Sequence, residues 1–193
     1  MLHSEALDSG TVRADAARNL EAVLTTGARM LAADPGASIA AIAAEAGVDR
    51  RTVYRRFDSR EQLLEAIYEA RLEAIGRAIE GARLREAPVP VALHRYVENI
   101  IVVNRKWPVD LSRMLGDDAV RRRRDAYVDE VDAFLERATE EGLLRPGLPG
   151  RWAGALLPEL VNLVNREQPG LSPGQAADVV VETLLHGIGG ASR

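Results

Sequence analysis

The chain has no cysteine among its 193 residues, and it contains only two phenylalanines and two tryptophans. Without cysteine it can form neither a disulfide nor a thiolate metal site, which is typical of a cytosolic protein. No window approaches the roughly 18 apolar residues that a membrane span requires. The N-terminus also lacks the basic and then apolar pattern of a secretion signal. We therefore expect a cytoplasmic protein without membrane contact.

The motifs of several enzyme classes are also absent. The sequence contains no G-x-S-x-G, no P-loop and no dinucleotide-binding glycine run. The three histidines, His3, His94 and His186, are isolated from one another, so neither a metal cluster nor a catalytic triad is evident. We expect a protein without catalytic residues, metal or cofactor.

Composition and periodicity indicate a folded, all-helical protein. Hydrophobic residues make up 47% of the chain and charged residues 28%, which suits a core with a solvated surface. Apolar residues recur at helical spacing, and no segment alternates with the period of a strand. We predict an all-α fold of about nine helices, over residues 11–33, 39–46, 50–57, 59–84, 91–107, 110–115, 118–141, 149–166 and 173–188.

The predicted helices divide into two domains behind a tail. Residues 1–10 are expected to be a disordered tail, residues 11–58 a three-helix domain, and residues 59–193 a larger helical bundle. The helix that begins at Ser59 is long enough to leave the first domain and enter the second.

The stretch 38–64 has the pattern of two short helices joined by a tight turn. Ile39 and Ile42 recur at helical spacing, and Ser38 is placed to cap their helix. Gly47 ends it, because only glycine enters the left-handed turn conformation at no steric cost. A helix, a glycine turn and a short helix rich in donors form the layout of a helix-turn-helix, whose second helix fits the DNA major groove.

The second of these helices has one apolar face and one basic face. Asp49 can cap it, and Val53 and Phe57, four residues apart, point inward. Between Arg50 and Arg60 there are five arginines against one aspartate, whereas the whole chain has a net charge of −4. A surface that approaches phosphates needs such a local concentration of positive charge, whatever the total.

Residues 42–64 follow the order I-A-x-x-A-G-V-x-[KR]-x-T-[LIV]-Y-x-x-F-x-[SN]-[KR]-x-x-L-[LI] without a gap. The matching residues are Ile42, Ala43, Ala46, Gly47, Val48, Arg50, Thr52, Val53, Tyr54, Phe57, Ser59, Arg60, Leu63 and Leu64. This order resembles the DNA-binding domain of the tetracycline-repressor (TetR) family of transcriptional regulators. The resemblance implies a homodimer that binds a double-stranded DNA operator, with a ligand pocket in the C-terminal bundle. Arg51 departs from the family pattern, which usually has a small residue or proline there.

The donors of the basic face fall into two groups. Arg50 and Arg51 stand at the start of the second helix, where arginine can bind guanine O6 and N7 with two hydrogen bonds. The other donors are better placed for phosphates, which position a domain without reading sequence: Ser38, Thr52, Tyr54, Arg55, Arg56 and Arg60. Each of these could instead be a solvated surface residue, and Tyr54 could equally pack on the helix core.

A second arginine run occupies residues 121–124. Four consecutive residues point all round a helix, so they cannot form one flat face. With Asp118 and Asp125 nearby, we expect ion pairs within the helix rather than DNA binding.

The last two predicted helices are apolar on more than one face. One face can pack on the bundle, and a second copy of the same pair would cover the other in a two-fold symmetric four-helix interface. Dimerisation also suits a palindromic site, because two recognition helices then meet successive major grooves. The predicted interface residues are Leu156, Leu160, Val164, Val180, Val181, Leu184, Leu185 and Ile188.

The ligand pocket implied by the resemblance is expected among polar and aromatic residues that interrupt apolar stripes. These residues are Tyr96, Asn99, Asn104, Trp107, Met114, Tyr127, Phe134, Asn162 and Asn165. Together they indicate a largely apolar cavity that suits a neutral or aromatic effector, and for each one a plain core or surface position is the alternative. Pro158 removes a backbone hydrogen bond inside a predicted helix and is expected to kink it.

We predict a transcriptional regulator, most simply a repressor released from a palindromic operator by a small apolar or aromatic effector of unknown identity. Two alternatives stay open. One is a regulator of the same fold that has no small-molecule ligand. The other is a helical small-molecule-binding or enzymatic bundle whose basic segment is incidental.

Overall fold

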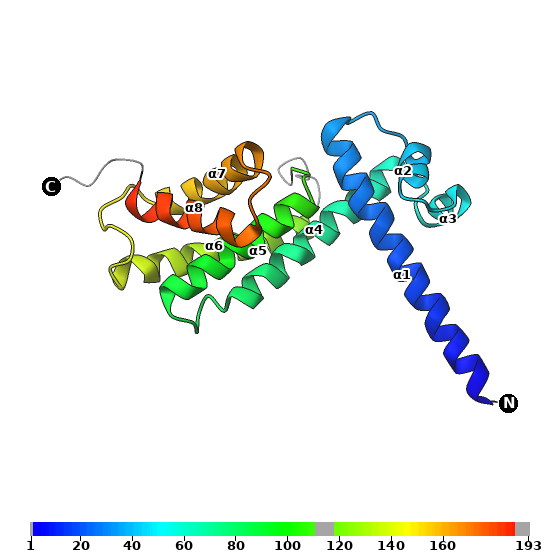
Figure 1. Ribbon diagram of the computed structural model, residues 1–193, viewed down its shortest axis with the longest axis horizontal. Coiled ribbons are helices and arrows are strands. Elements are labelled where there is room, and N and C mark those ends of the chain that lie inside the picture. Colours follow the sequence, from blue (N-terminus) through cyan, green and yellow to red (C-terminus); the bar gives the residue numbers. More distant parts are fainter. Residues whose placement is uncertain (1, 111–117, 188–193) are drawn as a thin grey trace. The chain divides into compact units, whose positions relative to one another are not determined.

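The computed structural model describes residues 2–110 and 118–187. Within these residues it has eight helices and no strand, which confirms the all-α prediction (Figure 1). The helices are α1 (Leu2–Ala33), α2 (Ile39–Glu45), α3 (Arg50–Arg56), α4 (Arg60–Ala82), α5 (Val89–Lys106), α6 (Asp118–Glu140), α7 (Trp152–Glu167) and α8 (Pro173–His186). The further helix predicted over 110–115 lies almost entirely outside the described residues. None of the described helices is both long and apolar enough to cross a membrane.

The first helix corrects the prediction of a disordered tail over residues 1–10. α1 begins at Leu2 rather than at residue 11 and runs for 32 residues. The added segment contains no proline, and extending a formed helix adds one hydrogen bond for each residue fixed, without the cost of nucleation. A polar N-terminal segment can therefore continue a helix that the core has already nucleated.

The chain forms two compact units, and the division between them falls inside α4. The N-terminal unit comprises Met1–Ala70 with Lys106–Arg113, and the C-terminal unit comprises Arg71–Arg105 with Met114–Arg193. The predicted domain boundary was residue 58. The first turns of α4 lie on the N-terminal side of the division because Leu63, Ile67 and Tyr68 are buried.

The core of the N-terminal unit joins α1 to α2 and α4. Its buried residues include Val23, Ala28, Leu31, Ile39, Ile42, Val53, Phe57, Leu63 and Ile67. α1 approaches α4 closely at Gly27, where an added Cβ would lie 2.8 Å from the Ile67 side chain. Outside this core, Arg29 on α1 forms a 2.8 Å ion pair with Glu45 on α2. This packing holds α2 and α3 against α1 and α4.

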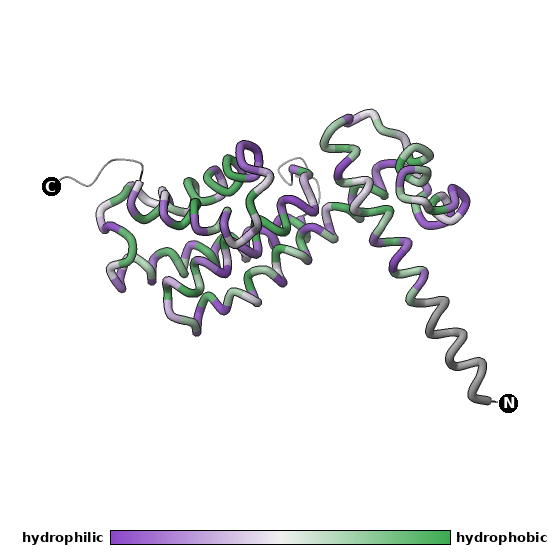
Figure 2. The backbone as a smooth tube through the Cα atoms, in the orientation of Figure 1, coloured by the Kyte–Doolittle hydropathy of each residue, from purple (hydrophilic) through white to green (hydrophobic). Residues whose placement is uncertain are grey.

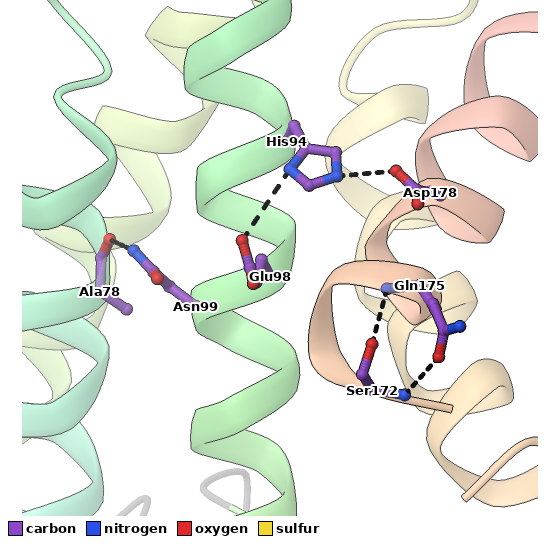
Figure 3. Close-up of polar contacts among 7 residues, drawn as sticks. All are labelled: Ala78, His94, Glu98, Asn99, Ser172, Gln175 and Asp178. Carbon is purple, nitrogen blue, oxygen red and sulfur yellow. Dashed lines mark hydrogen bonds and ion pairs between the residues drawn. The ribbon is translucent and has the colours of Figure 1, made fainter. Parts of the chain in front are cut away.

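The C-terminal unit has one core, to which the second half of α4 and all of α5 to α8 contribute. Its fully buried members include Leu93, Val97, Ile101, Val161 and Val180. Polar contacts at the edges fix how these helices meet, as Figure 3 shows.

Figure 3 draws two hydrogen bonds between helices and the cap that opens α8, beside the contact of His94 with Glu98 within α5. The Asp178 carboxylate of α8 accepts a hydrogen bond from His94 Nε2 of α5, at 2.9 Å. The Asn99 amide donates to the Ala78 carbonyl at 3.0 Å and so joins α5 to α4. A capping box between Ser172 and Gln175 opens α8. α8 is therefore fixed both at its first turn and along its side.

Candidate functional site

The starts of α2 and α3, and the turn between these helices, have the features that the sequence predicts. Ser38 Oγ accepts a hydrogen bond from the backbone N–H three residues further on, at 3.1 Å. Gly47 adopts φ = +67°, in the left-handed region that the turn requires. The Asp49 carboxylate accepts hydrogen bonds from the N–H groups of Arg51 (2.8 Å) and Thr52 (3.3 Å). The first turn of α3 is thereby fixed by side chains close to it in sequence.

α3 has two distinct faces. Val53, inside α3, is buried, and so is Phe57, the residue that follows the end of the helix. Four arginines are exposed on the other side, and Figure 2 shows hydrophilic residues gathered on α3. They are Arg50, Arg51, Arg55 and Arg56. Among the described residues no carboxylate pairs with any of these four guanidinium groups, so their charge is available to an anionic partner.

Tyr54 supports the first of these arginines. The residue is 39% exposed, so it does not pack in the core as the alternative interpretation supposed. The Arg50 guanidinium lies over this ring, 5.0 Å from its centroid, in a cation–π arrangement. This stacking limits the directions in which Arg50 can point. Thr52, between the two faces, is half-buried.

Arg60 is placed differently from the other predicted phosphate contacts. Its Nε donates to the Ala37 carbonyl at 3.4 Å, and one of its terminal nitrogens donates to the Pro35 carbonyl. Two of its three guanidinium nitrogens are therefore engaged with the turn that follows α1. Arg60 supports that turn within the N-terminal unit.

The arginine run on α6 is paired, as predicted. Arg121 lies 3.1 Å from Asp118, and Arg124 lies 2.8 Å from Asp125. These are contacts between near neighbours on one helix, and they neutralise much of the charge of the run.

A cavity of about 180 Å³ lies within the C-terminal unit and is lined by residues of α4, α5, α6 and α7. The predicted pocket residues Tyr96 and Tyr127 both line it. Most of the other lining side chains are apolar: Leu72, Ile75, Ile79, Ile100, Val128, Val131 and Pro158. The proline inside α7 thus faces the cavity. The prediction was a largely apolar cavity with a few amides and hydroxyls; this lining is largely apolar and has two tyrosine hydroxyls, but it contains none of the predicted asparagines.

Two charged residues of this cavity, Asp132 and Arg124, were not among the predicted pocket residues. Asp132 forms an ion pair with Arg151, which directly precedes α7. Burial, and then the negative charge of Asp132, raise the pKa of the Tyr96 hydroxyl above its ordinary value. Tyr96 therefore stays protonated at physiological pH and can donate a hydrogen bond.

Two glycines allow polar side chains of α6 to come close to neighbouring helices. A Cβ added at Gly76 of α4 would collide with the Tyr127 hydroxyl, and one added at Gly154 of α7 would collide with the Asp132 carboxylate. The polar side of the cavity thus depends on the absence of a side chain at both positions.

Several other predicted pocket residues lie elsewhere in the fold. Asn99 binds the α4 backbone, and Phe134 is in the core of the C-terminal unit. Trp107 is buried and belongs to the N-terminal unit. Met114 lies outside the described residues. Asn99, Phe134 and Trp107 are thus absent from the lining of this cavity, since apolar stripes are also interrupted where a side chain cross-links two helices or fills a core.

The remaining three asparagines belong to polar links near the end of α5. Arg71 donates to Asn104 at 3.1 Å, and Asn104 donates to Asn162 at 3.3 Å. Arg105 donates to Asn165 at 2.8 Å and, through a second nitrogen, to the backbone carbonyl that precedes α8. These bonds join α4, α5 and α7 within the C-terminal unit instead of lining the cavity.

The predicted dimer residues divide by burial. Val164 and Val180 are buried in the core of a single copy, so they cannot contribute to a face for a second copy. The others within the described residues are half-buried: Leu156, Leu160, Val181, Leu184 and Leu185. Ile188 lies outside the described residues. The exposed large apolar side chains of α7 and α8 are Trp152, Leu163 and Val179, which sequence analysis missed because both helices are apolar on several faces.

Comparison with known proteins places these features in a family. Residues 24–67 match the family described as bacterial regulatory proteins, tetR family. The chain is 30% identical over 177 residues to the HTH-type transcriptional repressor LfrR of Mycolicibacterium smegmatis, across 89% of this chain and 90% of that protein. It is 27% identical over 143 residues to the nucleoid occlusion factor SlmA of Marinobacter nauticus, across 70% and 73%.

A solved structure gives the same picture for the fold. The crystal structure of the TetR-like transcriptional regulator LfrR from Mycobacterium smegmatis in complex with proflavine has a TM-score of 0.70 and 28% sequence identity with this chain. The match covers 90% of this chain and 98% of that one. The similarity therefore extends well beyond the helix-turn-helix.

Proposed function

Because this chain belongs to the TetR family of transcriptional regulators, we propose that it is a cytoplasmic, non-enzymatic repressor. It binds a palindromic operator as a homodimer and leaves that operator when a small apolar or aromatic ligand binds in its C-terminal unit. The observation that carries the proposal is the exposed face of α3, a capped helix with four arginines that have no acidic partner in the part of the chain that the structure describes.

In this proposal the residues of α3 and its surroundings have separate roles. Arg50 and Arg51 read base edges, and stacking on Tyr54 supports the orientation of Arg50. The other donors, Ser38, Thr52, Tyr54, Arg55 and Arg56, bind phosphates and set the register of the domain. Arg60 acts indirectly, through the turn before α2 that it supports.

The dimer is proposed to form through α7 and α8. The exposed side chains of Trp152, Leu163 and Val179 on these helices have apolar surface that a second copy would cover. The half-buried residues Leu156, Leu160, Val181, Leu184 and Leu185 then line the edges of the interface. Two copies related by a two-fold axis would present their α3 helices to half-sites about one turn of DNA apart.

Release is proposed to be a population shift that depends on α4. This helix starts in the N-terminal unit, and its Leu72, Ile75 and Ile79 line the cavity of the C-terminal unit. A ligand that binds one conformation of α4 more tightly than another shifts the balance between DNA-binding and released dimers. The links from Arg71 to Asn104 and on to Asn162 connect α4 with the dimer helix α7.

The experiment that tests DNA recognition is the selection of bound fragments from genomic DNA with the purified chain. We expect recovery of fragments that share a palindrome, and loss of this selectivity in the double variant Arg50→Ala with Arg51→Ala. A variant lacking two arginines outside α3, Arg122→Ala with Arg145→Ala, serves as the control and should recover the same fragments as the wild type. Equal recovery by the α3 variant would refute the assignment of the reading residues.

A thermal-shift screen with metabolites and drugs tests the ligand. A bound effector stabilises the folded chain by mass action, so at least one compound is expected to raise the unfolding temperature and to reduce operator binding. No stabilisation by any compound would favour the alternative, a regulator of the same fold without a small-molecule ligand.

A further inference from the structure

Asp132 lies where two cavities of the C-terminal unit meet. It lines the apolar cavity of about 180 Å³ and also a second cavity of about 380 Å³ under the loop that leads into α7. Gly154 lines both cavities as well, and its missing side chain makes room for the Asp132 carboxylate. One carboxylate therefore stands at the boundary between two spaces.

The counter-charge of this carboxylate comes from a residue that is well placed to leave. Arg151 pairs with Asp132, and the arginine side chain is 64% exposed whereas the aspartate is only 19% exposed. Arg151 also has φ = +58°, a left-handed conformation that costs energy for a residue with a side chain. Because its side chain is already mostly exposed, little burial is lost when the guanidinium leaves the carboxylate.

The other cation that lines the small cavity cannot replace Arg151 without breaking bonds of its own. Arg124 donates from two nitrogens to Asp125, at 2.8 and 3.1 Å. Without Arg151, Asp132 would therefore face an apolar and aromatic space as an unbalanced negative charge. A largely buried carboxylate without a partner is costly, so the site then favours a positively charged occupant.

We propose that the effector is a cationic aromatic amine that displaces Arg151 from Asp132 and occupies the two cavities together. This inference rests on the proposed function and names the chemical class of its ligand. The cationic group pairs with Asp132, and the ring lies in the smaller cavity between Tyr96 and Tyr127. A neutral ligand provides no charge to replace Arg151, and an anion would be repelled by Asp132.

The sizes of the cavities fit this class. The smaller cavity alone, at about 180 Å³, lies below the roughly 300–1,000 Å³ of ordinary ligand pockets. The two cavities together fall within that range. Loss of the Arg151–Asp132 pair removes the ionic contact at the boundary between the two cavities. The cationic group of the ligand then takes the place of Arg151 there.

The displacement also gives the ligand a route to the dimer helix. Arg151 directly precedes Trp152, the first residue of α7 and its most exposed large apolar side chain. Release of Arg151 frees the start of α7, where the proposed dimer interface begins.

The test uses two probes of the same ring size on the full-length chain at mildly alkaline pH. Proflavine is protonated there and acridine is neutral, and fluorescence titration measures the Kd of each. We expect proflavine to bind at least about tenfold more tightly than acridine, as a charge-assisted contact implies. Asp132→Asn should weaken proflavine binding about tenfold and leave acridine unchanged.

Substitution of Arg151 gives a result of opposite sign. Arg151→Gln removes the competing cation, so it should tighten proflavine binding severalfold and again leave acridine unchanged. Asp129→Asn, one turn earlier on α6, and Arg122→Gln, on the same helix, lie outside the lining of both cavities. They are the matched controls and should change neither Kd by more than about twofold. Circular dichroism spectra of all variants establish that they are folded.

Three results would overturn the proposal: equal affinity for the two probes, unchanged proflavine affinity in Asp132→Asn, or weaker proflavine binding in Arg151→Gln. Each of them can occur while operator binding and its release by a neutral compound persist. In that case the proposed function stands and only the charge class of the effector is wrong. Absence of operator binding by the wild-type chain would instead refute the proposed function.

Discussion

Two helices of this protein each have four arginines within a short segment, and their surroundings differ. On α3 the arginines stand in two pairs on either side of Thr52, Val53 and Tyr54. Of the two aspartates that flank the helix, Asp49 caps it, and Asp58 forms no ion pair with these arginines within the described residues. On α6 the run 121–124 lies between Asp118 and Asp125, and arginines at both ends form ion pairs with them. The comparison teaches that available charge, not the number of arginines, marks the surface that can approach phosphates.

The largest expected effect concerns the arginines at the start of α3. Arg50→Ala with Arg51→Ala should weaken operator binding by about 100-fold or more, because each bidentate base contact contributes roughly 1–3 kcal/mol. Fluorescence anisotropy with a labelled operator measures the change. Arg121→Ala with Arg122→Ala removes the same charge from α6 and should weaken binding less than about twofold. Similar losses in both variants would mean that total charge alone determines binding.

The next effect concerns the two arginines at the end of α3. Arg55→Ala with Arg56→Ala should weaken binding to operator and unrelated DNA alike, by about tenfold at moderate salt. Because two phosphate contacts are lost in each copy, the slope of log K against log salt should fall in magnitude by about 3.6 for the dimer. Binding measured over a series of salt concentrations gives this slope. A loss of sequence preference with an unchanged slope would place these side chains at base edges instead.

A smaller effect, on stability, is expected at Asp49, whose carboxylate caps α3. Asp49→Ala should lower the free energy of unfolding by about 1 kcal/mol, because two N–H groups of α3 lose their acceptor. Asp118→Ala, which removes an exposed ion-pair partner on α6, should cost at most about 0.5 kcal/mol. Urea denaturation of both variants measures the difference. Equal costs would show that the Asp49 carboxylate does not stabilise α3 as a cap.

The smallest effect is expected at Tyr54. Tyr54→Leu removes the aromatic face beneath Arg50 and should weaken operator binding about threefold, as an exposed cation–π contact of roughly 0.5–1 kcal/mol implies. Tyr54→Phe keeps that face and removes only the hydroxyl proposed to bind a phosphate, so it should weaken operator binding less than Tyr54→Leu does. Competition titrations against the wild type can resolve differences in affinity of this size. A loss of affinity in Tyr54→Phe as large as that in Tyr54→Leu would show that the hydroxyl, rather than the ring, makes the contribution.

The N-terminal unit could be predicted closely because its signals are local. Ser38 and Asp49 cap helices through N–H groups two or three residues away, and Gly47 takes its turn conformation on its own. The apolar positions Val53 and Phe57 follow from helical spacing, and both are buried. The failure in this unit, the tail over residues 1–10, concerned the length of a helix and not its existence.

The C-terminal site could not be predicted to the same extent, because its contacts join residues far apart in the sequence. Asn104 and Asn162 are 58 residues apart and hydrogen-bonded, and nothing near either residue indicates the other. Asp132 was missed for the same reason, since its partner lies across a loop, before α7. Val164 and Val180 are buried, whereas Leu163 and Val179 are exposed. The hydropathy of the four side chains is similar, so the sequence alone does not distinguish the two pairs.

The most direct test of the α3 surface uses the absence of cysteine from the chain. An iron chelate attached to Asp58→Cys, directly after the buried Phe57, should cleave operator DNA at two symmetric positions about one helical turn apart. The same chelate attached to Arg122→Cys on α6 should leave the operator uncut. Cleavage from position 122 without cleavage from position 58 would contradict the claim that the unpaired arginine face of α3 is the surface that meets DNA.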